Sequence, residues 1–146
     1  MSEQTREPSR WTSDEIAVVV TGVLFVLVAS LPWYEAFVGV DKVAYRAWDL
    51  GISAVPGVVL ALYAAVRTQW LKKRPLPAEV PLAPGVEPFA AAALALVLTG
   101  YRALDVPYVA GAERVERTLW LSLGFCLVVL QAVCALRVVA RSGLRA

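Results

Sequence analysis

The sequence contains no histidine, and only two of its 146 residues are cysteine. The absence of histidine removes the most common general base and metal ligand of proteins. Neither a GxSxG segment nor a glycine-rich phosphate loop is present, and the acidic residues have no spacing that would pair them for catalysis. We therefore expect no enzyme activity, no catalytic residue, no cofactor and no metal.

The two cysteines, Cys126 and Cys134, lie eight residues apart in one apolar stretch. If this stretch is helical, its rise separates them by about 12 Å, which is too far for a disulfide between them. We expect both to be buried as small apolar residues, in preference to an intermolecular bridge or a metal site.

Charged residues make up only 18 % of the chain, and most of them lie between four long apolar stretches. Each stretch, with its flanks, supplies the roughly 20 helical residues that cross a bilayer core about 30 Å thick. The sequence therefore predicts an all-α fold, a four-transmembrane-helix bundle that forms a single membrane domain over residues 1–146. The expected spans are 13–32, 48–69, 87–105 and 117–138, with a proline-rich cytoplasmic linker at 70–88.

The connections differ in basic residues, which sets the expected orientation in the cell membrane. Nine basic residues lie in the N-terminal segment, the middle connection and the tail, and five lie in the first and third connections. The positive-inside rule then places both termini in the cytoplasm, N-in/C-in. The cluster Lys72-Lys73-Arg74 suits anionic lipid, so membrane lipid is an expected partner and nucleic acid is not.

Two further patterns concern the helices. Thr12-Ser13-Asp14-Glu15 has the spacing of a capping box, which favours a retained first helix over a cleaved signal peptide. Similar segments seventy residues apart allow two parallel-repeat helical hairpins, although chance similarity among Ala- and Leu-rich helices is the open alternative.

The first outer connection is rich in aromatic residues. Tryptophans at helix ends are expected as interfacial anchors, but this connection carries more aromatics than anchoring requires. It either packs as an ordered cap or offers a partner-binding surface. The candidates for interaction are Trp33, Tyr34, Phe37, Tyr45, Arg46 and Trp48.

Four residues within the predicted spans complete the interaction candidates. Gly57 and Ala61 belong to a small-residue face that allows close helix contact. Gln131 is the one strongly polar side chain near a helix centre, and we expect it to bond a neighbouring helix. Arg102 near an outer end either extends to the headgroups or pairs with an outer acidic residue.

The motifs Leu31-Pro32-Trp33-Tyr34 and Ala47-Trp48-Asp49-Leu50-Gly51 resemble those of uncharacterised small four-helix membrane proteins of actinobacteria. The resemblance covers the chain in topology and these motifs in sequence, and it implies no activity. Together, these features predict a non-catalytic accessory or structural subunit that forms a homo-oligomer or part of a larger membrane complex. The alternative is a small oligomeric channel or transporter, which would need a polar stripe along an oligomer axis.

Overall fold

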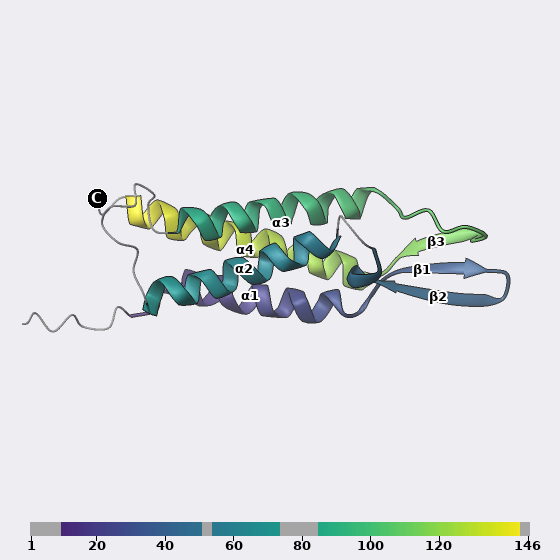
Figure 1. Cartoon of the computed structure of the whole chain (residues 1–146), viewed down its shortest axis with the longest axis horizontal. Coiled ribbons are helices and arrows are strands. Elements are labelled where there is room, and N and C mark those ends of the chain that lie inside the picture. Colours follow the sequence, from purple (N-terminus) through teal and green to yellow (C-terminus); the bar gives the residue numbers. More distant parts are fainter. Residues whose placement is uncertain (1–9, 51–53, 74–84, 144–146) are drawn as a thin grey trace, which may run out of the picture.

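The computed structural model describes residues 10–50, 54–73 and 85–143. Four helices lie side by side along the long axis of the molecule, and a small sheet extends from one end of them (Figure 1). The helices are α1 (Ser13–Ala29), α2 (Ala54–Lys73), α3 (Val86–Leu104) and α4 (Leu119–Gly143). The strands are β1 (Pro32–Val38), β2 (Asp41–Arg46) and β3 (Arg114–Arg117), and a 3-10 turn, η1 (Ala47–Leu50), leads from β2 toward α2.

Two of the helices, α1 and α3, begin at identified N-cap residues. The capping box of α1 is confirmed: the Thr12 backbone N–H donates to Glu15 Oε2 at 2.8 Å, and the Glu15 N–H donates to Thr12 Oγ1 at 3.3 Å. At α3 the N-cap is Gly85, whose φ of 98° lies in the left-handed region that favours glycine. Pro88 lies in the first turn of α3, where a backbone N–H would have no intrahelical partner and proline is therefore tolerated.

β1 and β2 form a tight antiparallel hairpin. Val38 pairs with Asp41, so the loop between the strands is only Gly39 and Val40. Gly39 has a φ of 60° and Val40 does not have a positive φ, which matches a type II′ turn with glycine at its first central position. Trp33, Tyr34 and the other aromatic and β-branched residues of these strands favour extended backbone.

β3 lies on the other side of β1, in the order β2-β1-β3, so a segment from the far half of the chain completes the sheet. Its ends are fastened to β1 by backbone bonds from Glu113 N–H to the Phe37 carbonyl, 2.8 Å, and from Thr118 N–H to the Trp33 carbonyl, 2.9 Å. The sheet therefore links the α1–α2 connection to the α3–α4 connection.

The prediction of an all-α four-transmembrane-helix bundle is wrong. The described residues form a mixed α/β fold, with three antiparallel strands beside the four helices. Within the described ranges, two helices, α2 and α4, are long and apolar enough to cross a membrane. The four-transmembrane-helix interpretation of the sequence failed because residues 32–50 and 114–117 form strands and a 3-10 turn, whereas we expected helix ends and loops.

Helix bounds differ from the predicted spans accordingly. The span expected at 13–32 ends as helix at Ala29, because Pro32 opens β1. α2 begins at Ala54 and ends at Lys73, so its C-terminal turn includes the first residues of the predicted linker 70–88. Residues 74–84 of that linker lie outside the described residues. The two halves are not equivalent hairpins, because one carries two strands and the other carries one.

The core has two parts. Near the sheet it gathers the buried side chains Phe25, Trp33, Tyr34 and Val128, together with small residues of α2 and α3. Toward the other end it consists of Val18 and mainly alanines, in which backbones come close because the side chains are small. α1 contacts α4 and α2, and α3 contacts α2 and α4, so the four helices form a closed ring.

Candidate functional site

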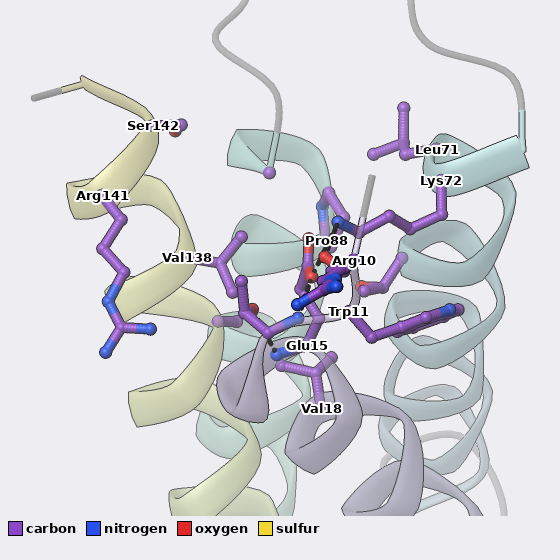
Figure 2. Close-up of a pocket in the computed structure, with 14 residues that line it drawn as sticks. Arg10, Trp11, Glu15, Val18, Leu71, Lys72, Pro88, Val138, Arg141 and Ser142 are labelled. Atoms are coloured by element: carbon purple, nitrogen blue, oxygen red, sulfur yellow. Dashed lines mark hydrogen bonds and ion pairs between the residues drawn. The ribbon is translucent and has the colours of Figure 1, made fainter. Parts of the chain in front are cut away.

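The end of the helices away from the sheet contains a cavity of about 740 Å³. All four helices contribute to it, and Figure 2 shows its lining residues. Its wall combines an apolar part with basic side chains. The lining residues are Arg10, Trp11, Thr12, Glu15, Val18, Thr68, Leu71, Lys72, Gly85, Pro88, Ala135, Val138, Arg141 and Ser142.

Arg10, Lys72 and Glu15 gather on one side of this cavity, and Arg141 lies opposite them on α4 (Figure 2). Lys72 Nζ is 2.9 Å from Glu15 Oε2 and donates to the Arg10 carbonyl at 3.2 Å. Burial raises the pKa of Glu15, but the bonds from Thr12 and Lys72 outweigh it and hold this pKa below the ordinary value. The carboxylate therefore stays charged and fixes the ammonium in place.

The opposite side has its own ion pair. Arg141 Nη1 lies 2.6 Å from Asp14 Oδ2, and Asp14 is only 7 % exposed. Asp14 does not line the cavity, whereas Arg141 does. The lining thus has three cations and one carboxylate, and it remains positive even when Asp14 is counted with it.

Gln131 lies next to Val18, one of the residues that line the cavity. Its side chain is fully buried, and Nε2 donates to the Val18 carbonyl at 3.2 Å and to the Ala61 carbonyl at 2.9 Å. Gln131 thus joins α4 to α1 and α2.

The small-residue positions lie at helix contacts. A Cβ placed on Gly57 would lie 3.3 Å from Thr99 Oγ1 on α3, and Ala61 is fully buried beside α1. Gly22 of α1 is tighter still, because its Cβ would be 2.8 Å from Ala65 Cβ. The sequence analysis missed Gly22, although a lone glycine within an apolar helix is the signal that would have found it.

The aromatic candidates of the first outer connection separate into buried and exposed residues. Trp33 and Tyr34 are fully buried, and Trp33 Nε1 donates to the Val28 carbonyl at 3.1 Å. Phe37 is half-buried beneath the Arg114 guanidinium, 4.9 Å from its ring centre. These residues therefore belong to an ordered cap, which was one of the two expectations.

The rest of that connection is nearer the surface. Tyr45 is half-buried against the core, and exposed Arg46 donates its backbone N–H to Asp49 Oδ2 at 2.9 Å. Trp48 is 41 % exposed and donates Nε1 to Ser30 Oγ at 3.2 Å. Among the candidates in the strands and η1, Trp48 offers the largest exposed aromatic surface.

Arg102 fastens the end of α3 to the sheet. Its side chain is 12 % exposed, Nη2 donates to the Leu50 carbonyl at 3.1 Å, and Nη1 lies 3.4 Å from Asp105. The Tyr34 hydroxyl donates to the Arg102 carbonyl. Burial raises the pKa of Tyr34, so the phenol keeps the proton that this bond requires.

A second, shallower cavity of about 570 Å³ lies beside Arg102, with Tyr45 and Tyr108 in its wall. Among the described residues, no group of three or more Cys, Asp or Glu side chains has the geometry to hold a metal ion. Arg10 and Arg141 at the basic cavity were absent from the predicted site residues, because only the fold brings residues 10, 72 and 141 together. Comparisons of the chain with known protein families, curated proteins and solved structures found no match.

Proposed function

We propose that this chain is a non-catalytic accessory or structural subunit in the cell membrane, with α2 and α4 crossing the bilayer. The supporting observation is apolar surface. Only 39 % of the apolar stretch of α2, and the same share of α4, is buried inside the protein. A helix at the core of a water-soluble protein would be mostly buried, so this exposed surface fits lipid or a membrane partner better.

The other two helices continue the same apolar surface. Large exposed apolar side chains occur on all four, and they lie between the charged helix ends. They include Ile16, Val20, Val23, Leu24 and Leu27 on α1, Val59, Leu62 and Val66 on α2, Leu94 and Val97 on α3, and Leu123, Phe125, Leu130, Val133 and Leu136 on α4. Exposed apolar surface of this extent marks a membrane or a protein contact.

Helix direction determines the proposed topology. α2 and α4 both begin near the sheet and end at the basic end, so the intervening chain, with α3, returns between them (Figure 1). Lys72, Lys73 and Arg141 lie at the basic end, which the positive-inside rule assigns to the cytoplasm. This multi-pass arrangement puts the sheet outside and both termini in the cytoplasm.

The packing supports an accessory role in preference to transport. Gln131, Gly22 and Ala61 pack tightly between α1, α2 and α4, and the amide of Gln131 is bound to backbone carbonyls. The exposed surfaces are the apolar helix faces and the sheet side with Trp48. The partners we propose are therefore membrane lipid and either a second copy or another membrane protein.

Labelling of introduced cysteines in intact cells tests this topology. The background protein carries Cys126→Ala and Cys134→Ala, so that only an introduced thiol reacts. A membrane-impermeant maleimide should modify Val40→Cys at the hairpin tip, where Val40 is fully exposed, and should miss Lys73→Cys until the cells are opened. Labelling of Lys73→Cys from outside, with Val40→Cys protected, would show the opposite topology. If neither site reacts after the cells are opened, the exposure of both residues is contradicted.

A further inference from the structure

The basic cavity combines charge with apolar wall, and this combination points to a class of ligand. We propose that it binds the phosphate group of a partly apolar molecule from the cytoplasmic side, with Arg10 and Lys72 as the phosphate ligands and Arg141 as a third cation. The phosphate source is either an anionic lipid headgroup or a soluble phosphate ester. The sidedness rests on the proposed membrane topology, whereas the binding itself does not.

The electrostatics of the wall favour an anion. Three lining residues are cations and one is a carboxylate, so the cavity keeps positive charge after Lys72 pairs with Glu15. Arg10 has no carboxylate partner among the described residues, and its guanidinium can form two parallel bonds with a phosphate. A basic pocket between helices at the cytoplasmic surface is a typical site for anionic headgroups.

The Lys72–Glu15 pair supports rather than opposes this role. Lys72 and Glu15 side chains are 17 % and 14 % exposed, and Glu15 is also bound by the Thr12 backbone. The ammonium is therefore held at the cavity wall before any ligand arrives, so little side-chain freedom is lost on binding. Lys72 also donates to the Arg10 carbonyl at 3.2 Å, so its positive charge lies next to the Arg10 backbone at the same wall.

The backbone adds donors on the opposite wall. Gly85 lines the cavity as the N-cap of α3, and no side-chain hydrogen bond from the described residues caps this helix. The first N–H groups of a helix lack intrahelical partners and carry partial positive charge, which suits an anion. In α3 they are those of Val86 and Glu87, because Pro88 has no N–H. Here they accompany the basic side chains and the cavity, so the helix terminus is a supplement to the site rather than the site itself.

The apolar part of the wall indicates that the ligand is more than free phosphate. Val18, Leu71, Pro88, Ala135 and Val138 form it, and Trp11 lies at the mouth with 42 % of its surface exposed. A volume of about 740 Å³ lies within the usual range of small-molecule pockets. A phosphate joined to a glycerol or similar apolar group would use both kinds of surface.

Binding to the purified full chain in a neutral detergent at low salt tests the proposal without reference to topology. The probes are a short-chain phosphatidylglycerol, glycerol phosphate, inorganic phosphate and, as a zwitterionic control, a short-chain phosphatidylcholine. Titration calorimetry gives the affinity of each. Arg10→Gln should weaken binding of the anionic probes by about tenfold or more, as expected for loss of a charged hydrogen-bonding partner.

Lys73→Gln is the matched control, because it removes the same charge from an exposed neighbour that does not line the cavity. It should change the affinity for the anionic probes by less than about twofold. Tight binding of phosphatidylglycerol with these effects identifies a lipid source, and equal binding of glycerol phosphate identifies a soluble one.

Three results would overturn the proposal. They are absence of saturable binding by every anionic probe, equal losses in Arg10→Gln and Lys73→Gln, and equally tight binding of phosphatidylcholine. Thermal unfolding of both variants without ligand verifies that each is folded. These measurements are made in detergent, so their outcome does not depend on the outcome of the labelling experiment that tests the proposed topology.

Discussion

Gly22 on α1 and Gln131 on α4 lie in direct contact at the centre of the ring of helices. A Cβ added to Gly22 would lie 2.6 Å from Gln131 Nε2 and 3.0 Å from the Ala61 carbonyl on α2. The same Ala61 carbonyl accepts the Gln131 amide at 2.9 Å. Three helices therefore approach one another only because one of them has no side chain at this level, and the glutamine fills the remaining space.

Gly22→Ala should lower stability, because the new methyl group must displace Gln131 and the Ala65 side chain. The expected loss is about 1–3 kcal/mol, the usual cost of overpacking a tight core. Thermal unfolding in detergent measures it. Gly100→Ala is the control, since its Cβ would meet only Phe125 at 3.4 Å and alanine has the higher helix propensity.

The same contact predicts coupling between the two positions. Gln131→Ala removes the nearest of the atoms that the new methyl group would meet, so the cost of Gly22→Ala should shrink in that background. Purely additive effects would contradict the close contact between Gly22 and Gln131.

The packing around Gln131 also predicts the absence of flux. The purified protein in liposomes should show no ion conductance or proton flux above that of empty vesicles, because a charged solute needs polar groups or water along its path. Gln131→Leu should change stability by only about 1 kcal/mol and leave association intact. Reproducible flux that is lost in Gln131→Leu would favour the channel alternative over the accessory subunit.

The helices were predictable because their signals are local. Thr12 and Glu15 form the predicted capping box, and Gly57 meets Thr99 on α3, as the small-residue spacing suggested. The hairpin was missed although it carries a signal: runs of aromatic and β-branched residues meet at the two-residue turn Gly39-Val40. The apolar flanks of these strands instead lengthened the predicted helices.

β3 could not be predicted in the same way. Its four residues, Arg114–Arg117, carry three charges and no strand pattern, and they become a strand only by pairing with β1, some eighty residues earlier. The basic cavity has the same origin, since Arg10, Lys72 and Arg141 have no common motif. Local sequence predicts elements, whereas sites assembled from distant segments depend on which helix ends meet.

Tyr34→Phe tests the bond that joins β1 to the end of α3. Loss of the hydroxyl, which donates to the Arg102 carbonyl, should lower stability by about 1 kcal/mol near neutral pH. The pKa of Tyr34 is raised by burial above its ordinary value of 10.0. Its contribution is therefore fully present below pH 10.0 and is lost as pH rises through the higher pKa of the folded protein.

Chemical unfolding of both proteins at neutral pH and at about pH 11 measures this dependence. The difference in the free energy of unfolding between the wild type and Tyr34→Phe should shrink at the higher pH. Ionisation of the other four tyrosines does not affect this difference, because both proteins contain them. A stability difference between the two proteins that is constant or grows with pH would contradict a protonated, buried Tyr34.

Trp33→Ala should lower the stability of the protein, whereas Trp48→Ala should weaken its association, although both residues belong to the same aromatic connection. Trp33 is fully buried and its ring lies 5.9 Å from that of Phe25, so its truncation should cost about 3–5 kcal/mol of stability. Trp48 is 41 % exposed, and its truncation should change stability little while weakening association with a second copy or another membrane protein. Thermal unfolding gives the first quantity, and cross-linking in native membranes gives the second. If every cross-linked species persists in Trp48→Ala, this side chain does not belong to the proposed contact surface. A large loss of thermal stability in Trp48→Ala would instead assign the side chain to the core.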